Sequence, residues 1–181
     1  MPTSPADRPE ILLETPRFRV AQHTVAAQDG TPQKKAIIHH PGSIVVLPWT
    51  EDGRVVLISN RRISVGAILW ELCAGTLEPP EPPAACAIRE LREETGYTAA
   101  RWEKLGEFWM SPGILEERMH AFVVRDLTPG RSALEAGEEI ETHVMPWTDA
   151  LAMIDRGEIE DAKTIAVLLL WDRRLRATGE A

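Results

Sequence analysis

Residues 75–97 read GTLEPPEPPAACAIRELREETGY, and the expected architecture follows from this segment. Prolines at 82 and 83 and a glycine at 96 predict a helix from about residue 82 to Thr95. Glu90, Glu93 and Glu94 are spaced i, i+3 and i+4, so their carboxylates share one face of that helix. Like charges on one face destabilise a helix, and its C-terminal end disfavours anions. Helix stability therefore does not explain these glutamates.

A divalent cation would explain the three carboxylates. Carboxylate oxygens are ligands of Mg²⁺, which completes its coordination shell with waters and substrate phosphates. The alternative for these residues taken alone is a solvated acidic helix face.

The spacing of the whole segment favours the metal site. It reads as G, five residues, E, seven residues and then R-E-U-x-E-E-x-G-U, where U is an apolar residue, here Leu91 and Tyr97. The fixed residues would coincide by chance at roughly 10⁻⁷ of start positions. The segment resembles the signature of the Nudix hydrolase family at every fixed position.

The resemblance implies hydrolysis of the pyrophosphate in a nucleoside diphosphate linked to another moiety. It also implies a cofactor of about one to three Mg²⁺ or Mn²⁺ ions. The implied metal ligands are the backbone carbonyl of Ala74 and the carboxylates of Glu90, Glu93 and Glu94, and Glu93 is also a catalytic candidate. Arg89 and Glu81 are expected to orient these carboxylates, and Gly75 and Gly96 are expected to form tight turns.

Flanking residues resemble the ADP-ribose pyrophosphatase branch of the family. Ser111-Pro112-Gly113 followed by Glu116-Glu117 is similar to the S-P-G-x-x-[DE]-E segment of that branch, and LWELCAG at 69–75 is similar to L-W-E-L-P-A-G. The substrate-binding residues implied by the resemblance are Arg62, Glu71, Pro112 and Gly113. The chain departs from the branch at Cys73, which replaces a proline, and at Arg61, which replaces a common aromatic residue.

The general base is expected in the acidic stretch 135–141, EAGEEIE. Glu138 aligns best with the glutamate commonly proposed for this branch, Glu139 is the reserve, and Glu117 is an alternative activator of water. A solvated acidic loop is the competing interpretation of the stretch. Geometry rather than pKa has to decide between them.

We expect an α/β fold, a Nudix-type α/β/α sandwich around a mixed sheet with an N-terminal antiparallel strand pair. The pair is predicted at 17–28 and 35–40, joined by the turn signal Asp29-Gly30. Residues 1–16 show no periodicity and are expected to form a loose leader. The predicted division is residues 1–41 for leader and dimerisation strands and 42–181 for the hydrolase domain. Thr148 is expected to cap a helix ending at Gly157, and a last helix is expected at about 161–177.

Composition narrows the functional class further. The 181 residues carry 20 Lys+Arg against 28 Asp+Glu, a formal charge of −8, which argues against a general nucleic-acid binder. Two cysteines cannot form a disulfide scaffold, and no apolar run is long enough for a membrane span. We therefore expect a cytoplasmic protein that binds neither nucleic acid nor membrane. In the resembled branch N-terminal strands exchange in a homodimer, so residues 17–40 are the expected interface.

Two groups of alternatives stay open at the level of sequence. The substrate could be GDP-mannose, a dinucleoside polyphosphate or NADH in place of ADP-ribose. The chain could also be a module that binds ADP-ribose without turnover, although its glutamate-rich signature is intact. Trp49 and Trp70 are candidates for stacking on a base.

Overall fold

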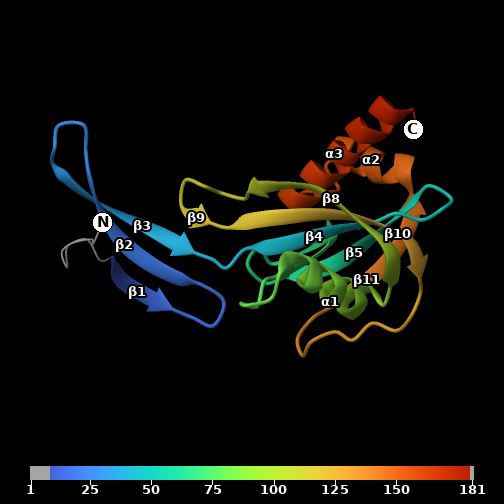
Figure 1. Ribbon diagram of the computed structural model, residues 1–181, viewed down its shortest axis with the longest axis horizontal. Helices are drawn as coiled ribbons and strands as arrows, with labels where there is room; N and C mark the ends of the chain where they lie inside the picture. Colours follow the sequence, from blue (N-terminus) through green and yellow to red (C-terminus); the bar gives the residue numbers. More distant parts are fainter. Residues whose placement is uncertain (1–8, 180–181) are drawn as a thin grey trace. The chain divides into compact units, whose positions relative to one another are not determined.

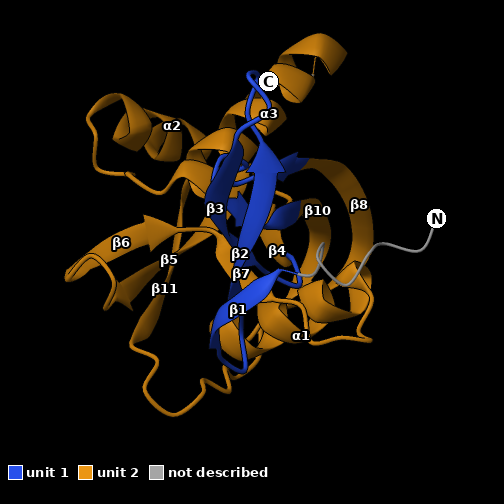
Figure 2. Cartoon of the chain, turned by 90° about the vertical axis from the view of Figure 1, so that its left-hand side faces the viewer, with its two compact units in different colours: residues 1–42, 108–119 blue, residues 43–107, 120–181 orange. Residues whose placement is uncertain are grey.

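The computed structural model describes residues 9–179, and the chain divides into two compact units (Figure 2). Unit 1 contains residues 1–42 and 108–119, and unit 2 contains residues 43–107 and 120–181. The chain therefore leaves unit 2 at residue 108 and returns to it after residue 119.

Unit 1 is a sheet of order β1-β2-β3-β9. Its strands are β1 (Glu10–Glu14), β2 (Arg19–Ala26), β3 (Pro32–His39) and β9 (Leu115–Glu116). β2 and β3 pair antiparallel from Arg19↔His39 to Ala26↔Pro32, which confirms the predicted strand pair. The carboxylate of Asp29 accepts the N–H of Thr31 at 3.0 Å and so stabilises the turn between them. β3 pairs in parallel with β9, a short strand that the sequence did not reveal.

The predicted loose leader is wrong where it falls on described residues. β1 pairs antiparallel with β2, from Glu10↔Gln22 to Glu14↔Arg19. Ile11, Leu12 and Leu13 are consecutive apolar residues, so they lack the alternation that marks a half-buried strand. All three stay about half exposed, at 47%, 50% and 50%. Residues 1–8 of the expected leader lie outside the described residues.

Unit 2 holds most of a sheet of order β7-β4-β10-β8 and a second sheet of order β11-β5-β6. The strands of the first are β7 (Cys73–Thr76), β4 (Ser43–Pro48), β10 (Arg118–Thr128) and β8 (Thr98–Trp109). Those of the second are β11 (Ile140–Pro146), β5 (Arg54–Arg62) and β6 (Ala67–Glu71). β6 ends at Glu71, and β7 begins at Cys73 in the other sheet. Between them the N–H of Leu72 donates to Oγ1 of Thr164 at 2.8 Å.

Three helices cover the sheets of unit 2: α1 (Pro83–Thr95), α2 (Trp147–Asp155) and α3 (Ala162–Thr178). α1 lies on one side of β4, and α2 and α3 lie on the other (Figure 1). Every residue of β4 is buried, as expected for a strand covered on both faces. The α/β/α sandwich is therefore confirmed.

Two of the predicted helix ends are confirmed by the structure, and one is wrong. Gly96 ends α1 in the left-handed region at φ 76°, and Asp161 caps α3 by accepting the N–H of Thr164 at 3.0 Å. The predicted cap at Thr148 is wrong, because α2 begins at Trp147 and no side chain caps it. Pro146 precedes the helix with φ −56°, so the ring supplies the local stiffness instead.

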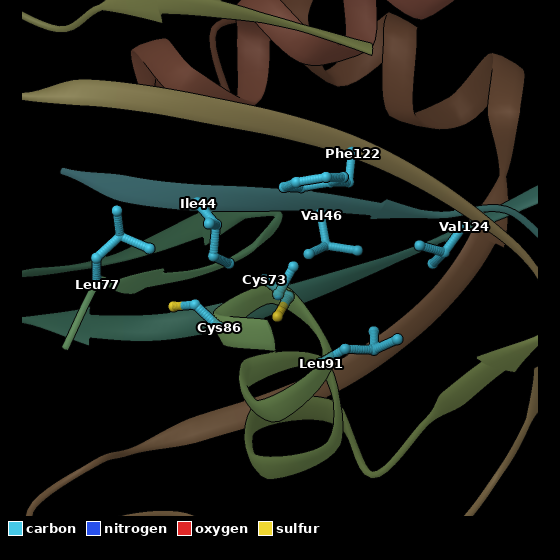
Figure 3. Close-up of a cluster of buried hydrophobic side chains, with 9 residues drawn as sticks. Ile44, Val46, Cys73, Leu77, Cys86, Leu91, Phe122 and Val124 are labelled. Atoms are coloured by element: carbon cyan, nitrogen blue, oxygen red, sulfur yellow. The ribbon is translucent and has the colours of Figure 1, made fainter. Parts of the chain in front are cut away.

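A cluster of buried side chains fixes how α1 lies on the sheet. Cys86 and Leu91 of α1 pack among Ile44 and Val46 of β4 and Cys73 of β7 (Figure 3). Burial raises the pKa of the Cys86 thiol to about 12 and that of Cys73 well above its usual value. Both thiols are therefore inert packing groups at neutral pH. None of the described helices has the length and apolar character needed to cross a bilayer.

Candidate active site

Glu90 reaches back from α1 onto the backbone of β7. Gly75 lies within β7, where it pairs with Ile44, so the expectation that it forms a tight turn is wrong. Its missing side chain instead leaves room for the carboxylate of Glu90. Glu90 is largely buried, and this burial is the main cause that raises its pKa.

Arg89 connects the acidic residues of the segment, as the sequence predicted. Its Nε and Nη2 each donate to Glu81 at 3.1 Å, and its Nη1 donates to Glu90 at 2.7 Å and to Glu93 at 3.1 Å. The hydrogen bonds to Glu81 are the largest cause that raises the pKa of Arg89. One guanidinium therefore holds three carboxylates that would otherwise repel one another.

Glu94 is the most deeply buried carboxylate of α1. Burial raises its pKa to about 8, although the N–H of Ala74 donates to its Oε2 at 3.0 Å. That bond ties the end of α1 to β7 and places the backbone of Ala74 directly beside the carboxylate. Glu90 and Glu94 thus share one buried face of α1, and burial makes each carboxyl harder to ionise than it is in water.

The segment after β10 brings more acidic residues toward α1. The N–H of Ala133 donates to the carbonyl of Glu93 at 2.9 Å, which fastens this segment to the helix. Farther along, the charge of Glu138 contributes to raising the pKa of both Glu90 and Glu94. The structure therefore brings Glu138 into electrostatic range of the glutamates on α1. Glu139 turns to Arg61 instead, whose Nε donates to it at 2.6 Å.

Arg62 and Glu71 form one partly buried network rather than two separate sites. Nε and Nη2 of Arg62 donate to the two carboxylate oxygens of Glu71, each at 2.6 Å. Lys163 at the start of α3 donates to Glu71 at 2.5 Å and to Asp161 at 2.9 Å. Hydrogen bonding to Glu71, and to a lesser degree the charge of Glu94, raises the pKa of Arg62.

No sequence pattern marks Lys163 as a residue of the site. Its one signal is its place in the first turn of a helix, where the helix dipole disfavours a cation. A lysine at such a position indicates an acidic partner elsewhere in the fold.

The remaining predicted residues are placed as follows. Pro112, Gly113 and Glu117 belong to unit 1, in the segment 108–119. Trp49 packs edge-on against Trp147 and Trp171, with ring centroids 5.1 and 6.0 Å apart, in a cluster with residues of α2 and α3.

The donors on α1 suit a hard divalent cation. Within residues 9–179 no three side chains of His, Cys, Asp or Glu lie together as a ready-made metal cluster. Glu90 and Glu94 nevertheless present two buried carboxylates with raised pKa values, and a cation would relieve the cost of ionising both. A site with few protein ligands, completed by waters and substrate phosphates, is typical of Mg²⁺.

Comparisons with known proteins show which family and fold the chain resembles. Residues 38–168 match the NUDIX domain family. An ADP-ribose pyrophosphatase of Bacillus subtilis is 37% identical over 142 residues, which cover 77% of each chain. A GDP-mannose pyrophosphatase of Citrobacter koseri is 39% identical over 136 residues, covering 70% of this chain and 71% of that protein. A crystal structure of an ADP compounds hydrolase shares the fold, with a TM-score of 0.80 at 20% identity over 96% of this chain and 97% of that one.

Proposed function

Because the chain belongs to the NUDIX domain family, we propose that it hydrolyses the pyrophosphate bond of ADP-ribose or a related nucleoside diphosphate sugar with Mg²⁺ or Mn²⁺. The products are a nucleoside monophosphate and a sugar phosphate. The observation that carries the proposal is the pair Glu90 and Glu94, buried on one face of α1 with Arg89 and Ala74 holding their carboxylates. A solvated acidic face would not show this burial.

ADP-ribose is the first candidate substrate and GDP-mannose the second. Relatives named as pyrophosphatases of ADP-ribose and of GDP-mannose are 37% and 39% identical to this chain. Both compounds contain a pyrophosphate between a nucleoside and a sugar, so the same carboxylates serve either of them. Contacts to the base and to the distal sugar therefore have to distinguish ADP-ribose from GDP-mannose.

Different residues of the site have different roles in the proposed reaction. Glu90, Glu94, Glu93 and the carbonyl of Ala74 would hold the cation, and Arg89 keeps the carboxylates oriented. When bound, Mg²⁺ or Mn²⁺ supplies neutralisation of the phosphoryl charge and lowers the pKa of the attacking water. Glu138 accepts the proton of that water, with Glu139 in reserve and Glu117 as the alternative. Arg62, fixed by Glu71, and the turn at Pro112 and Gly113 bind the substrate.

The proposal includes a homodimer formed through the N-terminal strands of residues 17–40, in a reducing cytoplasm where Cys73 and Cys86 remain thiols. The exposed apolar side chains on β1 in the same sheet support an interface there. No nucleic acid or membrane takes part.

A panel of nucleoside diphosphate derivatives tests the proposal. Wild-type protein with Mg²⁺ or Mn²⁺ is incubated with ADP-ribose, GDP-mannose, NADH and a dinucleoside polyphosphate, and the products are separated by chromatography. We expect AMP and ribose 5-phosphate from ADP-ribose, or GMP and mannose 1-phosphate from GDP-mannose. Tight binding of ADP-ribose without any product would contradict the proposal and indicate a binding module.

A further inference from the structure

The segment 129–139, which joins β10 to β11, is held at its beginning by α1. Ala133 donates its N–H to the carbonyl of Glu93 at 2.9 Å. Gly96 and Gly130 also approach so closely that a Cβ on Gly96 would lie 2.7 Å from the carbonyl oxygen of Gly130. This first attachment consists of backbone contacts and depends on the end of α1.

The end of the segment is held by Arg61 of β5. Ile140 pairs with Asn60 in the ladder of β11 and β5. Arg61 and Glu139 extend this pairing by one step, since the N–H of Arg61 donates to the carbonyl of Glu139 at 3.2 Å. The side chain adds a second bond, from Nε of Arg61 to Oε2 of Glu139 at 2.6 Å. Arg61 therefore makes two hydrogen bonds to Glu139 at the point where the segment enters β11.

Glu138 lies between these two attachments. Its N–H donates to the carbonyl of Glu135 at 3.1 Å, and its Oε2 accepts the N–H of Glu135 at 2.8 Å. These two bonds close a small turn, so the Glu138 carboxylate moves with the segment rather than independently of it. Its charge is felt by Glu90 and Glu94.

We infer that Arg61 is a positioning residue, which latches Glu139 and so fixes the neighbouring Glu138 carboxylate within the segment that is fastened to α1 at Glu93. The inference rests on the proposed function, because it assigns Arg61 a part in presenting the general base. The side chains of Arg61 and Glu139 are 49% and 66% exposed, so their ion pair is weak and sensitive to salt.

The test compares Arg61→Gln with Arg54→Gln. Both arginines lie on β5, and Arg54 makes a similar exposed pair through Nε, to Asp52 at 2.7 Å, in the turn that precedes β5. Arg61→Gln keeps the backbone bond and removes the ion pair. We expect kcat to fall about 3- to 10-fold with little change in KM, while Arg54→Gln leaves both unchanged. Arg61→Lys should recover part of the loss, and the charge swap Arg61→Glu with Glu139→Arg should recover more than either single variant.

Amide hydrogen exchange, measured without substrate, separates this inference from the proposed function. Arg61→Gln should speed exchange at the amides of Arg61 and Glu138 about 3- to 10-fold, and Arg54→Gln should not. If wild-type protein hydrolyses no substrate, the proposed function fails, and with it the role of Arg61 in catalysis. If wild type is active but Arg61→Gln leaves kcat unchanged, the positioning role is overturned even when exchange becomes faster. Unchanged exchange at both amides overturns the latch itself.

Discussion

A Cβ added to Gly75 would lie 2.0 Å from the carboxylate carbon of Glu90. The absent side chain on β7 is therefore what allows this glutamate to reach its position. Gly75→Ala should displace Glu90 and lower kcat/KM at least about 100-fold, with only a modest loss of stability. Gly106→Ala is the matched control, because a Cβ on that strand glycine meets nothing within 4 Å. Normal steady-state kinetics for Gly75→Ala would show that the position of Glu90 is not required.

Glu94 should make the metal-free protein less stable as the pH rises. Its folded pKa is raised from 4.5 to about 8, so its contribution to stability is complete below pH 4.5 and is lost as the pH rises through 8. In EDTA at pH 8.5, Glu94→Gln should therefore melt at least about 3 °C above wild type, and the difference should vanish near pH 4. Scanning calorimetry measures both. Glu158→Gln, at an exposed carboxylate paired with Arg156, should not gain stability at pH 8.5.

Removal of divalent cations should abolish substrate binding as well as turnover. The chain carries a formal charge of −8, and the proposed site includes the carboxylates of Glu90, Glu93 and Glu94. Without a cation these carboxylates repel the phosphates. Calorimetric titration with a non-hydrolysable ADP-ribose analogue should give an affinity at least about 10-fold weaker in EDTA than in Mg²⁺. Equal affinity in both buffers would disprove the metal-bridged arrangement.

Glu138→Gln and Glu139→Gln should differ in magnitude. Loss of a general base costs about 10²- to 10⁴-fold in rate, so Glu138→Gln should reduce kcat by that amount. Glu139→Gln removes only the ion pair with Arg61 and should cost about 3- to 10-fold. Single-turnover kinetics separate the chemical step from product release. The reverse order of effects would transfer the base to Glu139, and small effects at both would favour Glu117.

The N-terminal strands should carry the dimer. Leu12 lies on β1 with half of its surface exposed, between Ile11 and Leu13. Leu12→Lys should weaken association, because it buries a charge in the proposed interface. Light scattering after size exclusion should show a dimer for wild type at micromolar concentration and a shift toward monomer for the variant. Lys104→Gln, at an exposed position on β8 outside the N-terminal sheet, serves as the control for a change in charge. A wild-type monomer at micromolar concentration would rule the dimer out.

The signature from Gly75 to Gly96 was readable from sequence because its information is local. The helical period places Glu90, Glu93 and Glu94 on one face, and proline and glycine mark the helix ends. The strand pair at Asp29-Gly30 was readable for the same reason, since a turn joins neighbouring segments. β1 was missed because three successive apolar residues give no alternating pattern.

The contacts that complete the candidate site depend on residues far apart in the chain. Lys163 meets Glu71 across 92 positions and Arg61 meets Glu139 across 78, and no periodicity connects either pair. Gly75 fits the pattern of a turn residue when read locally, and its function as space for Glu90 becomes visible once α1 packs against β7. Local spacing thus settled which groups the chain offers for chemistry. Strand pairing and helix packing settled where those groups stand, because they alone bring distant backbone segments within hydrogen-bonding distance.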